Sequence, residues 1–114
     1  MSEPICLQQR HCLPYKGMTV LSRVEAQQRL VQLASGWSVD EEANVIHKLF
    51  QFKDFHHTMA FVNALAWIAH RENHHPDLEV SYASCRVRYT THALGGLSEN
   101  DFICAAMIDA LDAE

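Results

Sequence analysis

The segment from Phe55 to about Asn73 constrains the fold of this chain more than any other. It follows Asp54, whose carboxylate is suited to cap the first turn of a helix. A helix built from this segment would be apolar around more than one stripe, and such a helix must be covered on two sides. Its apolar positions are Met59, Ala60, Phe61, Val62, Ala64, Leu65, Ala66, Trp67, Ile68 and Ala69. One side would pack on a sheet of the same chain, and a second subunit is a candidate for the other.

Two pairs of short strands are predicted to form that sheet. The first pair covers residues 37–39 and 45–52, around a turn at 40–44, and the second pair covers 78–82 and 85–89. In the second pair apolar and polar residues alternate, which is typical of half-buried strands. The inward residues would be Leu78, Val80, Tyr82, Cys85, Val87 and Tyr89.

Capping signals predict two more helices, one before and one after these strands. Ser22 and Glu25 have the spacing of a capping box, and Gly36 would end the helix that follows. Residues 98–101 form a second such box before a last helix that ends near Leu111. The order helix, two strands, helix, two strands, helix predicts an α+β domain. We expect a two-layer α-β-β-α-β-β-α fold, with a four-stranded antiparallel sheet and helices packed on one face.

Residues 21–114 are assigned to this single domain, a usual size for one. Residues 1–20 carry Pro4, Pro14 and Gly17 and have no sustained period, so we expect a loosely ordered, irregular N-terminal arm on the surface.

Composition excludes several classes of protein. The net charge of −5 comes without a basic block, which argues against nucleic acid as a direct partner. The first residues lack a signal peptide pattern, and no apolar run reaches membrane-spanning length, so we expect no membrane partner and a cytoplasmic location. The four cysteines have the spacing of neither a disulfide framework nor zinc knuckles, and we expect free thiols.

The eight histidines are the one anomaly of the composition. Three of them, His74, His75 and His92, stand at the predicted ends of elements, where a fold exposes side chains to a substrate. Imidazole both gives and takes a proton near neutral pH, so this set suggests acid–base chemistry. The structural alternative is a histidine that only interacts with a helix C-terminus, which fits His70 or His74 taken alone. The remaining four, His11, His47, His56 and His57, are assigned structural or surface roles.

A zinc site is a competing interpretation. His70 and His74 are four residues apart, so on one helix they would stack as metal-binding pairs do. A metalloprotease helix needs a glutamate directly after the first histidine, and Arg71 stands there instead. The arm offers Cys6, His11 and Cys12 without a fourth ligand. We therefore expect no metal.

Taken together, these residues resemble the pterin-4a-carbinolamine dehydratase family. The family pattern, as it falls on this chain, consists of His70, His74-His75-Pro76, Tyr82, His92 and Asp101. The segments 50–55 and 96–101 and the pair Gly36-Trp37 are also similar to the family, so the resemblance covers about residues 20 to 111. At the first position the family commonly has a carboxylate where this chain has His70.

The resemblance implies a reaction and roles for the matching residues. The substrate would be a 4a-hydroxytetrahydropterin, the carbinolamine left by an aromatic amino acid hydroxylase, and loss of water would give quinonoid dihydropterin. His74 and His92 would exchange the protons, and His75 would hold and orient the pterin with a share in proton transfer, so all three are the expected catalytic residues. The expected substrate-binding residues are His70, Pro76, Asp77, Tyr82, Thr91 and Asp101.

The resemblance also bears on cofactors and partners. It implies no cofactor, a homodimer or homotetramer, and a functional link to a hydroxylase. A non-catalytic dimerisation or regulatory module on the same fold is the alternative function.

Overall fold

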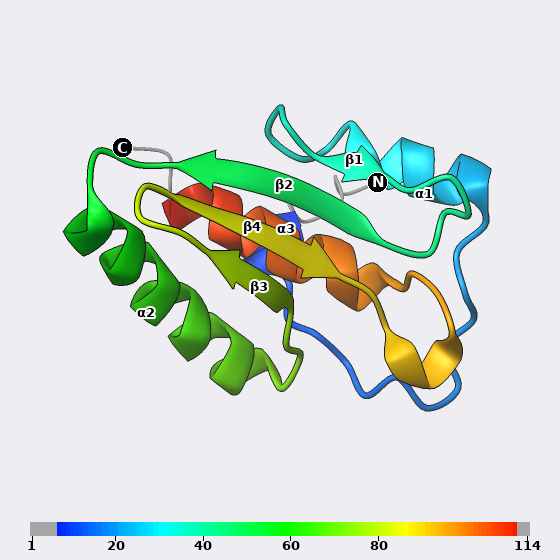
Figure 1. The fold of residues 1–114 in the computed structure, drawn as a ribbon. Coiled ribbons are helices and arrows are strands. Elements are labelled where there is room, and N and C mark those ends of the chain that lie inside the picture. The colour runs from blue at the N-terminus through cyan, green and yellow to red at the C-terminus, as the bar shows by residue number, and fades with distance from the viewer. Residues whose placement is uncertain (1–6, 112–114) are drawn as a thin grey trace.

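The structure, a computed structural model, describes residues 7–111 of the 114-residue chain. Its helices are α1 (Arg23–Leu30), α2 (Phe55–Glu72) and α3 (Glu99–Leu111), with short 3-10 turns η1 (Leu7–Gln9) and η2 (His92–Leu94). Its strands are β1 (Ser38–Val39), β2 (Ile46–Gln51), β3 (Asp77–Val80) and β4 (Ser84–Tyr89). Figure 1 shows α2 and α3 on one side of the sheet. The predicted α+β order of elements is confirmed.

The sheet is antiparallel throughout, with the strand order β1-β2-β4-β3. Phe50 on β2 pairs with Cys85 on β4, and Val87 pairs with Lys48 on one side and Leu78 on the other. The sheet residues in the core are Ile46, Phe50, Cys85, Val87 and Tyr89. Facing them, α3 buries an almost unbroken run of residues from Asn100 to Ile108. The central strands and α3 therefore form the core.

A strand forms where the second pair was predicted to begin, but β3 is shorter than residues 78–82 and is mostly exposed. The strand ends at Val80, and both Val80 and Tyr82 are exposed, so only Leu78 packs against the core. Val80 and Tyr82 are exposed because β3 is an edge strand, with a neighbouring strand on one side only. Alternation in the sequence cannot distinguish an edge strand from a central one.

The long helix is covered on one side by the rest of the chain. Phe61, Leu65 and Ile68 belong to the core, whereas Trp67 is 62% exposed on another side of the helix. Within residues 7–111, no helix is long and apolar enough to cross a membrane. The second subunit that we expected over the exposed side stays a prediction.

The N-terminal arm is not loose where it is described. Leu7 is buried in the core, and η1 packs against α3. The Leu13 N–H donates to Asn100 Oδ1 at 3.0 Å, and Asn100 Nδ2 donates back to the Leu13 carbonyl at 2.6 Å. The Cys12 N–H donates to Glu72 Oε1 at 2.7 Å. Side chains of α2 and α3 therefore hold residues 7–13, which corrects the expectation of a loosely ordered arm; Pro4 and Cys6 lie outside the described residues.

Candidate active site

His74 lies just beyond the end of α2 and contacts the sheet. Asn73 has φ 52°, a left-handed conformation that ends the helix at Glu72. The backbone N–H of His74 still donates to the Ala69 carbonyl at 3.1 Å, so the turn is tied to the last helical turn. Beyond it, the His74 ring stacks on the ring of Tyr89 at 5.3 Å, with 13° between the planes.

Asp101 fixes the orientation of that ring. Its Oδ1 lies 2.6 Å from His74 Nε2, and its carboxylate is fully buried in the first turn of α3. The Ser98 N–H and the Thr91 hydroxyl donate to Oδ2, at 2.9 and 3.0 Å. An ionised carboxylate only accepts hydrogen bonds, so His74 donates its Nε2–H here and keeps Nδ1 for other partners. This is the carboxylate–imidazole pairing that sets a tautomer in acid–base sites.

This arrangement differs from the capping box predicted at 98–101. Only half of that box forms: Asp101 accepts the Ser98 N–H, but the Ser98 hydroxyl pairs with the Thr91 hydroxyl at 2.7 Å. One carboxylate therefore both caps α3 and holds His74. At the other helices, the capping box at Ser22 and the cap at Asp54 form as predicted.

One open pocket of about 230 Å³ brings the three predicted proton carriers together. His74 and His75 come from the turn after α2, and His92 comes from η2, which directly follows β4. The other lining residues are Tyr15, Asn73, Thr90, Thr91 and Ala93. His92 is exposed, with its Nε2 4.0 Å from the Asp77 carboxylate. The pocket therefore combines one rigid imidazole, His74, with two that are solvent-accessible.

A neighbouring pocket of about 360 Å³ meets the first one at His74, Asn73 and Tyr15. The arm forms one of its sides, through residues 12–15, and Arg71, Glu72 and Asn100 line the rest. Tyr15 was not among the predicted site residues, because the arm carries no motif that indicates a role. Asn73, also missed, has a recognisable signal, because asparagine readily takes the left-handed position that ends a helix.

Two predicted binding residues lie away from this pocket. Tyr82 is exposed, and its carbonyl accepts a hydrogen bond from Thr58 in the first turns of α2. An 18-residue helix is about 27 Å long, so Tyr82 and His74 lie at opposite ends of α2. His70 is exposed beside Trp67, 6.4 Å between ring centroids. Within one chain, neither residue lines the pocket that holds the three histidines, and their contact with a substrate stays a prediction.

The other predicted binding residues are closer to the histidines. Thr91 lines the pocket, Asp101 supports His74 from behind, and Asp77 contacts His92. Pro76 is half-buried between His75 and the start of β3, and it is not among the pocket-lining residues.

The structure does not place His70 and His74 on one helix, which the zinc interpretation required. His70 and His74 could stack only on a continuous helix, and α2 ends at Glu72. In the part of the chain that the structure describes, no group of three or more His, Cys, Asp or Glu side chains is arranged to hold a metal ion.

Buried groups beside the site have shifted pKa values. Burial raises the pKa of Tyr89, with the Cys104 thiol adding to the effect, so the ring under His74 remains a neutral phenol. At Glu72, burial opposes ionisation, but hydrogen bonds from the Cys12 N–H, His11 and Arg71 outweigh it and lower the pKa. Cys12, Cys85 and Cys104 are free thiols, as predicted.

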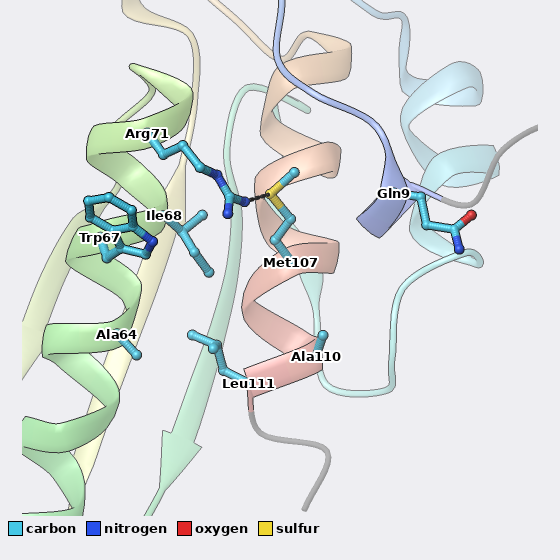
Figure 2. Close-up of a pocket in the computed structure, with 8 residues that line it drawn as sticks. All are labelled: Gln9, Ala64, Trp67, Ile68, Arg71, Met107, Ala110 and Leu111. Atoms are coloured by element: carbon cyan, nitrogen blue, oxygen red, sulfur yellow. Dashed lines mark hydrogen bonds between the residues drawn. The ribbon is translucent and has the colours of Figure 1, made fainter.

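A separate pocket of about 440 Å³ lies between α2 and α3 (Figure 2). Arg71 reaches across it to the Met107 sulfur, 3.4 Å away, and Trp67 and Ile68 line its α2 side (Figure 2). None of the three histidines predicted to carry protons lines it, because all three line the pocket at His74.

The fold is that of pterin dehydratase structures. The crystal structure of a transcriptional coactivator/pterin dehydratase from Brucella melitensis matches with a TM-score of 0.77 and 29% sequence identity, over 82% of this chain and 98% of that one. A pterin dehydratase-like protein identified as a RuBisCO assembly factor in the alpha-carboxysome matches with a TM-score of 0.60 and 25% identity, over 69% of this chain and 92% of that one.

The sequence comparison identifies the family to which the chain belongs. The model of the family described as Pterin 4 alpha carbinolamine dehydratase matches residues 19–111, and the chain belongs to this family. Two relatives carry the name "Putative pterin-4-alpha-carbinolamine dehydratase". The one from Nitrosomonas eutropha is 54% identical over 94% of this chain and 95% of its own length. The one from Legionella pneumophila is 53% identical over 92% of this chain and 94% of its own length.

Proposed function

We propose that this protein is a hydro-lyase that removes water from a 4a-hydroxytetrahydropterin and releases quinonoid dihydropterin, the form that a reductase recycles for an aromatic amino acid hydroxylase. The observation that carries the proposal is the pocket that gathers His74, His75 and His92, with His74 fixed by a buried carboxylate. Membership of the dehydratase family supplies the substrate class.

The chemistry asks little of the protein beyond proton transfer and positioning. The lone pair of the ring nitrogen next to the carbinol carbon forms a C=N bond as the C–O bond breaks. The departing oxygen takes up one proton and leaves as water, and the nitrogen releases one proton. Each well-placed acid or base contributes about 10²- to 10⁴-fold to such a step.

His74 and His92 are the two groups proposed to exchange these protons. His74 is the better defined, because Asp101 holds its Nε2–H and leaves Nδ1 for the substrate. His92 lines the same pocket at an exposed position, with its Nε2 4.0 Å from the Asp77 carboxylate. His75, exposed and adjacent to His74, is proposed to orient the pterin ring.

The test follows carbinolamine breakdown by ultraviolet absorbance, with and without protein. We expect acceleration by the wild type, a loss of about 10²-fold or more in His74→Ala and His92→Ala, and no loss in His56→Ala, an exposed histidine at the start of α2. Dehydration at the spontaneous rate with folded wild-type protein would defeat the enzyme proposal. Wild-type rates in both site variants would defeat the residue assignment alone.

A second candidate is a binding module that regulates or assembles another protein. It is favoured by the similarity to the pterin dehydratase-like RuBisCO assembly factor and by the exposure of Trp67 on the outer side of α2. Under this alternative the protein, as a homodimer or homotetramer, would bind its partner with all three histidines replaced. The same assay separates the two functions, because a module of this kind need not accelerate dehydration.

A further inference from the structure

The arm is held against the site by a carboxylate in an unusual place. Glu72 is the last residue of α2, where the helix dipole disfavours negative charge. Its side chain is 2% exposed, and the arm supplies two of its partners: the Cys12 N–H at 2.7 Å and His11 Nδ1 at 2.9 Å. Arg71 provides the third contact at 3.0 Å. A buried carboxylate at a helix C-terminus needs such partners, so the arm and Glu72 stabilise each other.

A second anchor leads the chain directly to the pocket. Asn100 binds both the N–H and the carbonyl of Leu13, which fixes the backbone two residues before Tyr15. A turn then follows, in which the Met18 N–H donates to the Tyr15 carbonyl at 2.9 Å and Gly17 takes a positive φ of 87°. Tyr15 is therefore held at both ends, although its ring is 53% exposed.

Tyr15 is placed where a substrate would meet it. It lines both pockets that meet at His74, and among the described residues it is the one aromatic side chain that does so besides the histidines. The ring of a tyrosine offers a flat apolar face, and its hydroxyl offers a donor and an acceptor at the edge. These are the groups that suit a flat bicyclic ring with polar edges.

We infer that residues 12–15 of the arm form one wall of the active site. Within this wall Tyr15 is a substrate-positioning residue, held in place by Glu72 and Asn100. This inference rests on the proposed function for the identity of the ligand, a pterin. Tyr15 contributes binding rather than proton transfer, because the histidines already supply the acid and base. Its loss should therefore change KM and the dissociation constant for a pterin, and leave kcat unchanged.

The experiment compares Tyr15→Ala, Tyr15→Phe and Phe55→Ala with the wild type. Phe55 is a matched control, an aromatic residue of similar exposure, 48%, that lines neither pocket. We measure KM and kcat for the carbinolamine, and the Kd of 7,8-dihydrobiopterin as a non-reacting probe. Tyr15→Ala should raise KM and Kd about tenfold, Tyr15→Phe should retain most of the binding, and Phe55→Ala should match the wild type. Melting temperatures identify any variant that fails to fold.

A double-mutant cycle tests whether Glu72 holds Tyr15 in place. Glu72→Gln should raise the Kd of the probe in the same direction, and the combination with Tyr15→Ala should add little, because both act through one element. Unchanged KM and Kd in Tyr15→Ala, or an equal loss in Phe55→Ala, would overturn the inference while the dehydratase proposal stands. A wild type that binds the probe without catalysis, and loses binding in Tyr15→Ala, would defeat the dehydratase proposal alone. A wild type that neither binds the probe nor accelerates dehydration overturns both.

Discussion

Replacing Asp101 with asparagine should change the tautomer of His74 while it leaves the shape of the site nearly unchanged. In the wild type, Oδ1 accepts from His74 Nε2, and Oδ2 accepts from Ser98 and Thr91. An asparagine keeps one oxygen, which can still serve Ser98 and Thr91, and presents an N–H₂ group to His74. Because that group donates, His74 Nε2 must become an acceptor, and the proton of the neutral ring moves to Nδ1.

The cost in stability follows from the number of bonds. Hydrogen bonds to a charged acceptor are worth about 1.5–3 kcal/mol and neutral ones about 0.5–1.5 kcal/mol, so each of the three bonds to His74, Ser98 and Thr91 weakens by about 1 kcal/mol. A total loss of about 3 kcal/mol corresponds to a fall of roughly 12 °C in Tm for a domain of this size. The protein should therefore stay folded at 25 °C.

The loss of activity should be much larger than the loss of stability can explain. With the wrong tautomer, His74 can no longer play its part in proton transfer, and we expect kcat to fall by about 10²- to 10⁴-fold. The assay is the ultraviolet measurement of carbinolamine breakdown, beside thermal unfolding of the same samples.

Asp109→Asn is the matched control. Asp109 is also almost buried on α3 and accepts hydrogen bonds from Trp37 and Lys48, away from the histidines. It should lose stability and retain kcat. An Asp101→Asn protein that keeps wild-type kcat, or that loses activity only in proportion to its unfolded fraction, would refute the role given to the Asp101–His74 pair.

Two further predictions concern the surroundings of the site. In Gly96→Ala the new Cβ would lie 2.7 Å from Val20 Cγ1, and overpacking of this kind costs about 1–3 kcal/mol. An unchanged unfolding free energy in urea would contradict this. Glu72 has a pKa below its ordinary value of 4.5, so its stabilising effect is present above pH 4.5 and is lost as the pH falls through the lowered value. The difference in unfolding free energy between the wild type and Glu72→Gln should therefore shrink as the pH falls below 4.5, and a constant difference down to pH 3 would show that folding does not lower the pKa of Glu72.

Much of the fold was predictable because its signals are local. Asp54, Ser22 and the apolar run of α2 act on residues within a turn or two of themselves, and the structure confirms each of them. The exposure of β3 was not predictable, because the alternation of Leu78 and Val80 is the same in a central strand as in an edge strand. Only the strand order, which the sequence pattern does not contain, decides between the two.

The candidate site was predictable in its residue types and only partly in its geometry. The three histidines share a pocket, as the positions at element ends indicated, but Tyr82 does not join them. A motif gives the order of residues along the chain, whereas α2 separates Tyr82 from His74 by its whole length. Tyr15 could not be found in this way, because long-range bonds to Glu72 and Asn100 position the arm.

Two residues of the site depart from the preferences that govern helix ends. Glu72 places a negative charge at a helix C-terminus, and Asp101 uses its carboxylate to hold a histidine as well as to cap a helix. Each of these two carboxylates is stabilised by partners from a distant segment of the chain. Formation of the first turn of α3 therefore orients His74, because one carboxylate makes both sets of contacts. A variant that frays the start of α3 should lose the orientation of His74 together with helix structure, because the carboxylate that holds the ring also accepts the Ser98 N–H at the start of the helix.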